Sequence, residues 1–180
     1  MPSACLRILV AGALILAPVL AGCTGDSEKD RTLTSPASPP ESTSKLPPKK
    51  ADLPEPPEGA GPIDADAPEE FTATRSGLYY RILRKSNGRK PRSYETVIAH
   101  YKGWLNNGRQ FDSSYDRGEP ATFPLNGVVA GWTEGLQLIG EGGMIELEIP
   151  GKLGYGPQGR PPSIPPNATL HFIIELKKIK

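Results

Sequence analysis

Cysteine and histidine, on which nucleophilic, redox and metal sites often depend, are scarce in this chain. Its 180 residues contain two of each. Cys5 and Cys23 both lie near the N-terminus without a histidine beside them, so they make a poor metal site and cannot cross-link the rest of the chain. We therefore expect a domain that is stable without disulfides, and a function that uses no metal and no cofactor.

An excess of charge of one sign is also missing. The formal net charge is +1 at pH 7 and no long basic stretch occurs, which argues against nucleic acid as a partner. Proline and glycine, in contrast, are abundant, at 21 and 20 residues. The prolines are unevenly placed, which predicts a low-complexity segment joined to one loop-rich domain.

The longest apolar run covers residues 8–20 and is interrupted by a glycine and a proline. It is shorter than the roughly 20 apolar residues that span a bilayer, and Arg7 precedes it, as in a secretory signal peptide. The run ends in Leu20-Ala21-Gly22-Cys23, which resembles the bacterial lipobox. We predict a signal peptide over residues 1–22 and a lipid anchor on Cys23, where multiple acyl chains give stable membrane binding. The alternative is a plain secretory signal that happens to precede a cysteine.

The residue after Cys23 indicates in which membrane such a lipoprotein would be anchored. Thr24 follows Cys23, so the aspartate that retains many such lipoproteins in the inner membrane is missing. We expect an envelope protein. If the source has two membranes, the pattern favours the outer membrane, facing the periplasm.

Residues 23–70 form the proline-rich part of the chain. Isolated aliphatic residues such as Leu46, Leu53 and Ile63 are too sparse to build a core, so we expect a disordered tether with polyproline II character. Its Pro-Pro pairs could alternatively be ligands for a proline-binding module. We expect order to begin near Phe71, with a single domain over residues 71–180.

Alternating and helical patterns in residues 71–180 predict an α+β fold. Strands are expected over residues 77–83, 96–105, 109–113, 121–125, 144–149 and 169–177, and one helix over residues 128–139. The architecture is a bent antiparallel sheet of about five strands wrapped on one short helix. A long Gly/Pro-rich loop over residues 151–167 completes it, and a loop of this length is usually functional.

Aromatic residues make up only 7% of the chain, yet several occur around a single carboxylate. The set comprises Tyr101, Phe111-Asp112-Ser113-Ser114, Gly131-Trp132, Leu153-Gly154-Tyr155-Gly156 and Ile164-Pro165-Pro166. Apolar residues with a few polar groups are typical of a concave ligand site. Because no catalytic triad, metal cluster or phosphate loop accompanies them, the site suits chemistry without a nucleophile or proton transfer.

These stretches resemble the FKBP-type peptidyl-prolyl cis-trans isomerases. The matching segments are His100-Tyr101-Lys102-Gly103, Asn107-Gly108-Arg109-Gln110-Phe111-Asp112-Ser113-Ser114, Gly131-Trp132-Thr133-Glu134-Gly135, Tyr155-Gly156 and Ile164-Pro165-Pro166-Asn167-Ala168-Thr169-Leu170. Each segment alone is weak, but together they follow the family's order and nearly its spacing over about a hundred residues.

The resemblance implies an isomerase that acts on proline-containing polypeptides, and it assigns roles to particular residues. Asp112 and Tyr155 are the implied catalytic residues: a carboxylate at the pocket wall, and a loop hydroxyl that meets a substrate carbonyl. The implied substrate-binding residues are Tyr101, Phe111, Arg117, Phe123, Val128, Val129, Trp132, Ile164 and Phe172. Among them, Trp132 is the floor of the pocket and the Val129 N–H binds a ligand carbonyl.

Without the resemblance, several of these residues have simpler interpretations. Trp132, Phe123 and Phe172 read as ordinary core residues, and Asp112 as a turn former. Tyr155 reads as a residue that packs a loop. The two histidines, His100 and His171, lie on outward faces of expected strands, and we interpret both as surface residues.

Four positions depart from the family pattern. Ala121 stands where well-studied members have an aromatic residue, and the chain is shortened at Gly127. Ser163 replaces a common aliphatic residue and Arg160 introduces a charge. These changes concern the rim, so neither the preference for the residue before proline nor the affinity for macrolide inhibitors carries over from the family.

The leading functional hypothesis is a lipid-anchored, monomeric prolyl isomerase that assists the folding of envelope or secreted proteins. A second hypothesis is a binding module or chaperone that uses the same cleft without turnover. A third is a lipoprotein whose domain is only structural. Isomerase activity on a proline peptide discriminates the first from the other two.

Overall fold

The structure is a computed structural model that describes residues 49–180. The predicted signal peptide, Cys23 and the tether up to residue 48 lie outside the described residues. Within residues 49–180, no helix is both long and apolar enough to cross a membrane.

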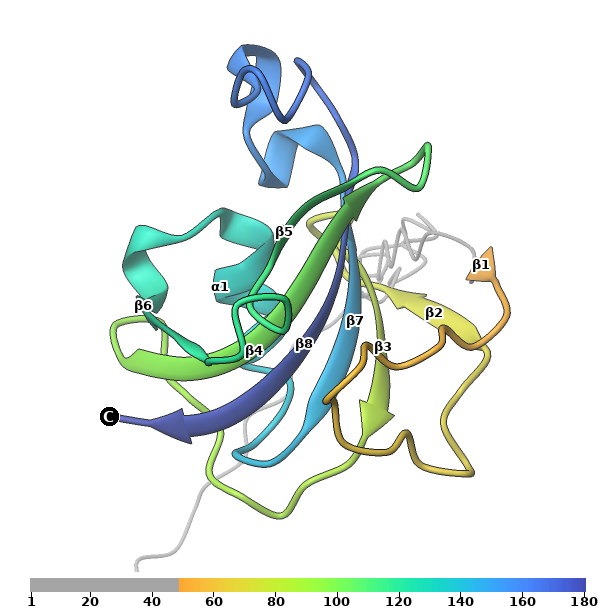
Figure 1. Ribbon diagram of the computed structural model, residues 1–180, viewed down its shortest axis with the longest axis vertical. Helices are drawn as coiled ribbons and strands as arrows, with labels where there is room; N and C mark the ends of the chain where they lie inside the picture. The colour runs from red at the N-terminus through yellow and green to blue at the C-terminus, as the bar shows by residue number, and fades with distance from the viewer. Residues whose placement is uncertain (1–48) are drawn as a thin grey trace, which may run out of the picture. The chain divides into compact units, whose positions relative to one another are not determined.

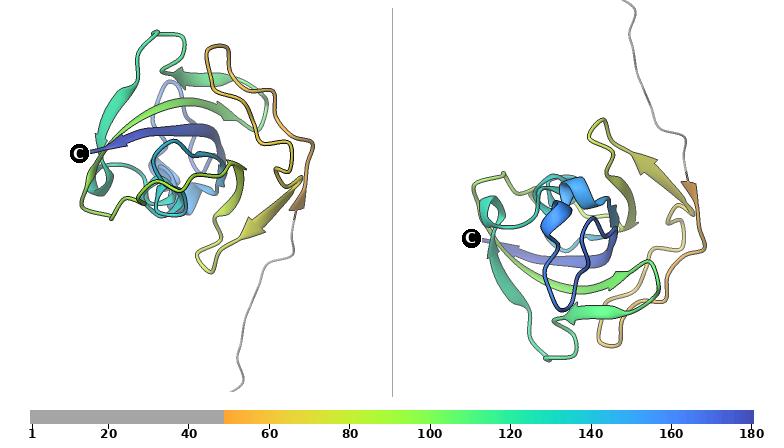
Figure 2. Two further views of the ribbon diagram at one scale, coloured as in Figure 1. Left: turned by 90° about the horizontal axis from the view of Figure 1, so that it is seen from below. Right: turned by 90° about the horizontal axis from the view of Figure 1, so that it is seen from above.

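The described residues form a curved antiparallel sheet around one helix, which confirms the predicted fold class (Figures 1 and 2). The strands are β1 (Lys49–Lys50), β2 (Glu70–Ala73), β3 (Tyr79–Arg84), β4 (Thr96–Leu105), β5 (Gln110–Ser113), β6 (Ala121–Pro124), β7 (Met144–Ile149) and β8 (Leu170–Ile179). Their order in the sheet is β1-β2-β3-β7-β8-β4-β5, and β6 pairs with β4. The sheet thus has eight strands rather than about five, because all six predicted strand segments form and β1 and β2 are added to them.

The concave face of the sheet holds the main core. Alternation along β4 buries Val97, Ala99 and Tyr101, while the intervening residues are only partly covered. Alternate residues of β7 and β8 complete this face, which packs on Trp132 and Leu136 of the helix. The core therefore forms where the period-two pattern of the strands meets one helical face.

Helix α1 (Ala130–Leu136) is shorter than the predicted residues 128–139. Val129 precedes the helix with extended backbone angles, φ −60° and ψ 147°. Just after the helix, the Leu138 N–H donates to the Gly135 carbonyl, three residues back, so the last turn has the tighter hydrogen-bonding pattern of a 3₁₀-helix. The spacing of the apolar residues predicted which face of the helix is buried, but it did not predict the first and last residues of the helix.

Two glycines bring α1 into close contact with β7. A Cβ atom on Gly131 would lie 2.6 Å from Ile149 Cγ2, and one on Gly135 would lie 2.6 Å from Leu147 Cδ1. Any larger residue at either position would push the helix away from the sheet. Trp132 lies between these glycines in the sequence, so the close packing of α1 on β7 fixes how deeply its indole is buried.

The convex face of the sheet is covered by residues 49–70, and here the structure differs from the predicted tether (Figure 1). Arg81 of β3 is 2% exposed and donates from Nη1 to the carbonyls of Ala51 (2.6 Å) and Glu69 (2.9 Å). Its Nη2 donates to the Asp52 carbonyl at 2.5 Å, and its Nε donates to Glu146 Oε2 at 2.7 Å. One buried guanidinium thus holds both ends of the segment.

A small second core forms under the same segment. Ala60 and Ile63 pack against the buried side chains of Leu83, Met144 and Ile173. The Asp64 N–H also donates to the Leu83 carbonyl at 2.8 Å. The domain boundary near Phe71 is corrected accordingly. Residues 49–70 lie against the domain because the convex face of the sheet offers apolar residues and a buried arginine.

The long loop between β7 and β8 has more structure than its composition suggests. It contains two short 3₁₀ turns, η2 (Gly151–Leu153) and η3 (Gly156–Gln158). A third turn, η1 (Leu125–Gly127), precedes α1. Arg109 Nη2 donates to the Ser163 carbonyl at 2.5 Å, which ties the loop to the β4–β5 hairpin. The loop is therefore held in place beside the open end of the core.

Candidate functional site

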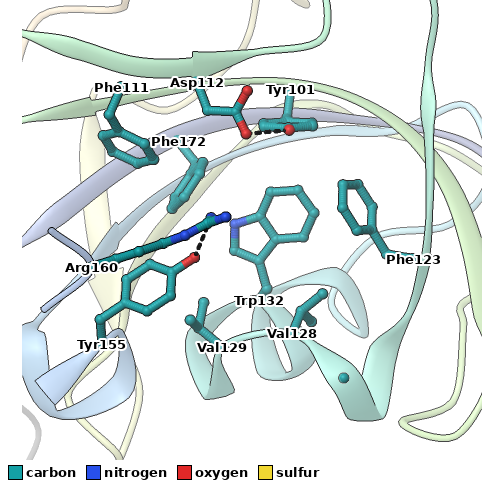
Figure 3. A pocket seen from close by; sticks show the side chains of 11 residues that line it. Tyr101, Phe111, Asp112, Phe123, Val128, Val129, Trp132, Tyr155, Arg160 and Phe172 are labelled. Carbon is teal, nitrogen blue, oxygen red and sulfur yellow. Dashed lines mark hydrogen bonds between the residues drawn. The ribbon is translucent and has the colours of Figure 1, made fainter. Parts of the chain in front are cut away.

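A pocket of about 410 Å³ opens between α1, the sheet and the long loop. Eleven residues line it: Tyr101, Phe111, Asp112, Phe123, Gly127, Val128, Val129, Trp132, Tyr155, Arg160 and Phe172. Figure 3 shows Trp132 in the middle of the group, with Tyr155 and Arg160 on one side and Phe123 on the other. The residues come from four strands, the helix, the segment from η1 to the helix and the long loop, so the fold brings together positions that are distant in sequence.

Aromatic rings form the body of the pocket around Trp132, which is 4% exposed. Its indole meets the rings of Tyr101, Phe123 and Phe172 edge to face, each at a centroid distance of 5.2 Å. This is the favoured arrangement for aromatic pairs. Within the described residues the buried indole N–H has no hydrogen-bond partner. The floor of the pocket is therefore rigid, apolar and shielded from water.

One charged cluster stands in the wall of this apolar pocket. Tyr101 Oη donates to Asp112 Oδ2 at 2.5 Å, and Arg117 Nη1 donates to Asp112 Oδ1 at 2.5 Å. Arg117 Nη2 also donates to Tyr101 Oη at 2.8 Å, so the three groups form a closed triangle.

The triangle holds each of its members in one charge state. Partial burial disfavours the Asp112 carboxylate, but the hydrogen bonds from Tyr101 and Arg117 outweigh it and hold the pKa of Asp112 below its ordinary value. Burial, together with the hydrogen bond to Asp112, raises the pKa of Tyr101 to about 12. At neutral pH the wall is thus a carboxylate with both oxygens already bonded, which makes it a poor proton acceptor.

Two hydrogen-bond donors remain for a ligand. The Tyr155 hydroxyl lies at the pocket with one neighbour, Arg160 Nη1, at 3.5 Å. Because the guanidinium donates to the Tyr155 oxygen, the hydroxyl proton stays available. The Val129 N–H immediately precedes α1, and within residues 49–180 it donates to no backbone or side-chain acceptor. Together the two donors can bind two carbonyl groups of one ligand.

The structure brings together all but two of the residues that the resemblance assigns to the site. Arg117 does not line the pocket, and it acts on it through Asp112 and Tyr101. Ile164 is 2% exposed and faces a smaller adjacent hollow. Arg160 and Gly127 line the pocket but were noted only as departures from the family pattern. The sequence feature that could have identified Arg160 as a pocket residue is its position on the loop between Tyr155 and Ile164.

The two histidines lie outside the pocket, and both are partly buried against neighbouring rings. His100 stacks on Tyr115 at 4.7 Å and its Nδ1 lies 3.0 Å from Ser114 Oγ. Ser114 is fully buried and its oxygen also accepts the Tyr101 N–H, so this serine–histidine pair is structural. His171 stacks on Trp104 at 5.8 Å. Burial lowers the pKa of both histidines.

The fold and the site together define a small sheet-on-helix domain with an aromatic, water-shielded pocket and two free donors. Residues 87–177 match the sequence profile of the FKBP-type peptidyl-prolyl cis-trans isomerases, about half of the chain. The chain therefore belongs to this family.

Particular relatives agree with this assignment. The FKBP-type peptidyl-prolyl cis-trans isomerase FkpA of Escherichia coli K12 is 49% identical over 115 residues, which are 63% of this chain and 42% of the relative. The FKBP-type 22 kDa isomerase of the same strain is 45% identical over 123 residues, 68% of this chain and 60% of the relative. The chain thus spans less than half the length of the FkpA proteins that it matches.

Solved structures show the same fold. The crystal structure of FkpA from Escherichia coli superposes with a TM-score of 0.59 at 47% identity, covering 61% of this chain and 51% of that chain. The crystal structure of AtFKBP13 superposes with a TM-score of 0.57 at 35% identity, covering 61% of this chain and 98% of that chain.

Proposed function

We propose that this protein is a peptidyl-prolyl cis-trans isomerase that acts as a monomer on proline-containing polypeptides. The observation that carries the proposal is the pocket itself. It combines an aromatic floor at Trp132 with free donors at Tyr155 and Val129, while its carboxylate is already bonded on both oxygens. Such a site can grip and desolvate a peptide but has no free group for proton transfer.

Rotation of an X–Pro amide needs this kind of site. Resonance gives the C–N bond double-bond character and a barrier of about 18–20 kcal/mol. In the twisted transition state this resonance is lost, so the amide is less polar than in either ground state. An apolar pocket therefore favours the twisted form over the planar forms, which is catalysis by differential binding. An acceleration of about 10⁶ requires about 8 kcal/mol, so desolvation acts together with shape and oriented hydrogen bonds.

The pocket residues take distinct roles in this mechanism. The prolyl ring sits on the Trp132 indole. The Tyr155 hydroxyl donates to the carbonyl of the residue before proline, and the Val129 N–H donates to the carbonyl of proline itself. Asp112 is fixed by Tyr101 and Arg117, and it shapes and polarises the wall. A macrolide inhibitor that fills the pocket is expected to compete for the same two donors.

The experiment is a protease-coupled assay of the full chain on an Ala-Leu-Pro-Phe peptide. A rate constant that increases in proportion to protein concentration supports the proposal. A rate equal to that of the uncatalysed peptide at every protein concentration overturns it.

A second candidate is a peptide-binding module or chaperone that uses the same cleft without turnover. The observation that favours it is the altered rim, where Arg160 lines the pocket and Ala121 replaces an aromatic residue. Suppression of aggregation of a proline-free client, together with no acceleration of the peptide, would favour this candidate.

We further propose that the protein is a lipoprotein of the cell envelope, anchored through Cys23. The Leu20-Ala21-Gly22-Cys23 sequence supports the anchor, and Thr24 supports the outer membrane of a two-membrane source, facing the periplasm. An anchor at this position would leave the isomerase domain free to meet exported chains. Its clients would then be proteins that fold after export.

A further inference from the structure

A second hollow of about 350 Å³ adjoins the main pocket under the tip of the long loop. It is lined by Phe111, Asp112, Arg160, Pro161, Pro162, Ser163 and Ile164. Three of these residues, Phe111, Asp112 and Arg160, also line the main pocket. A peptide whose proline occupies the main pocket therefore has room in the second hollow for a side chain next to the proline.

The two hollows together carry an uncompensated positive charge. The carboxylate that they share, Asp112, is paired with Arg117. Arg160 is exposed, and among the described residues no carboxylate lies within 4.0 Å of its guanidinium. Its contacts are with Tyr155, whose hydroxyl is 3.5 Å from Nη1 and whose ring centroid is 5.9 Å from Cζ (Figure 3).

A second arginine adds to this charge from behind the loop. Arg109 donates to the carbonyl of Ser163, one of the residues that line the second hollow. Within the described part of the chain it has no carboxylate partner either. Arg160 thus lines the hollow, and Arg109 contacts it only through the Ser163 carbonyl.

We propose that Arg160 makes the enzyme favour substrates with an acidic residue directly before the proline. This inference rests on the proposed isomerase function, because it uses the assignment of Tyr155 to the carbonyl of that residue. A residue whose carbonyl meets the Tyr155 hydroxyl comes within reach of Arg160, because Arg160 Nη1 is 3.5 Å from that hydroxyl and Arg160 lines both hollows. A glutamate or aspartate there forms an ion pair with the guanidinium, whereas a lysine is repelled.

A simpler role for Arg160 is to orient the Tyr155 ring and hydroxyl. The two roles predict different results. If Arg160 only orients Tyr155, its loss lowers kcat/KM by the same factor for every peptide. If Arg160 pairs with the charge of the substrate, its loss changes the ratio of kcat/KM between acidic and neutral peptides. The ratio of kcat/KM for an acidic peptide to that for a neutral peptide therefore separates the two roles, even if the substitution also lowers kcat/KM for every peptide.

The test uses NMR exchange rates of Ala-Xaa-Pro-Phe peptides with Xaa as Glu, Gln, Lys or Leu. For the full chain we expect kcat/KM for Glu to exceed that for Gln by about three- to fivefold, as for an exposed ion pair, and Lys to fall below Gln. In Arg160→Gln the Glu/Gln ratio falls to about one, and in Arg160→Lys part of the preference returns. Added salt at about 1 M, where the Debye length is about 3 Å, should remove the preference of the wild-type protein.

Arg75→Gln is the matched control, because it removes the same charge from an exposed position in the turn between β2 and β3 and should keep the full ratio. A glutamate after the proline should give no preference.

Efficient turnover of the Leu and Gln peptides with a Glu/Gln ratio of one would overturn the inference and leave the isomerase function intact. So would a ratio unchanged by Arg160→Gln, or a preference for glutamate only after the proline. No acceleration of any peptide would instead overturn the proposed function, and the inference with it.

Discussion

At the scale of single residues, the pKa values of two groups in the pocket wall, Asp112 and Tyr101, are moved away from neutrality. Asp112 keeps its charge because Tyr101 and Arg117 bond to it, and the pKa of Tyr101 is raised to about 12 by burial and by that carboxylate. The histidines, which could titrate near neutrality, lie outside the pocket. The pocket therefore presents one electrostatic state over a broad pH range.

This predicts a flat pH profile for kcat/KM with an uncharged peptide. Because the pKa of Asp112 is depressed, its carboxylate persists as the pH falls, and activity should decline only once the pH approaches that pKa. From about pH 5 to about pH 9 the rate constant should change by less than about twofold. NMR exchange at a series of pH values measures it. A bell-shaped profile centred near neutrality would show that a group in the site exchanges protons during the reaction.

Tyr155 offers the most specific residue-level probe of the proposed hydrogen bonds. Tyr155→Phe removes one hydroxyl and keeps the ring, so kcat/KM should fall by about three- to tenfold, as expected for the loss of one hydrogen bond. Tyr79→Phe makes the same change on β3 outside the pocket and should leave the rate unchanged. Equal rates for Tyr155→Phe and the wild-type protein would remove Tyr155 from the mechanism.

At the scale of elements, the alternating strands were predictable and the covering segment was not. β4 and β7 have the predicted bounds because each has a clear period of two. β8 was predicted to bury one face, yet Ile173 on its other face is 2% exposed because Ala60 and Ile63 cover it. The adjacent apolar pair at Ile173 and Ile174 is the signal in the sequence for a strand that is covered on both sides.

The residue pattern predicted an apolar ligand site around Asp112, and the family resemblance predicted which residues line it. Trp132 and Phe172 alone read as core, which is also where they lie, since a pocket floor is part of the core. Contacts such as Arg81 with the carbonyls of residues 51, 52 and 69 depend on chain geometry, and no local pattern reports them. Arg160 was visible in the sequence, but only the structure shows that it lines two hollows.

Removal of the buried arginine under this segment should destabilise the domain strongly. The side chains of Arg81 and Glu146 are 1% and 7% exposed, so Arg81→Met leaves a buried, unpaired carboxylate. We expect a loss of about 3–5 kcal/mol in the free energy of unfolding, measured by urea titration. The double variant Arg81→Met/Glu146→Leu should recover the part of the loss that comes from the unpaired carboxylate, but not the part from the lost bonds to the carbonyls of residues 51, 52 and 69. The exposed Arg75→Met should change stability by less than about 0.5 kcal/mol.

The pH dependence of this variant gives an independent check. Burial raises the pKa of Glu146 even beside Arg81, and without the arginine it should rise further. A carboxyl group with a raised folded-state pKa binds more protons in the folded state than in the unfolded state. The deficit of Arg81→Met should therefore shrink as the pH falls from neutrality toward the unfolded-state pKa. A deficit that grows on acidification would contradict the buried-carboxylate explanation.

At the scale of the whole molecule, the proposed lipid anchor on Cys23 would link the proposed isomerase domain to a membrane. If Cys23 is acylated as proposed, full-length protein expressed in a bacterial host should partition into the detergent phase. Cys23→Ser should move the protein to the aqueous phase with unchanged isomerase activity. Cys5→Ser is the matched control, since that residue lies in the proposed signal peptide, and it should behave as the wild type. Identical partitioning of all three proteins would contradict the anchor.

We propose that this pocket catalyses rotation about an X–Pro bond without proton transfer, because its carboxylate is already hydrogen-bonded on both oxygens. The most direct measurement is the NMR exchange rate between the cis and trans forms of an Ala-Leu-Pro-Phe peptide, with and without a small amount of the full chain. We predict that both interconversion rates rise together in proportion to protein concentration, while the cis-to-trans ratio of the free peptide stays constant. Exchange that remains at the uncatalysed value, tens of seconds or longer, would contradict the account.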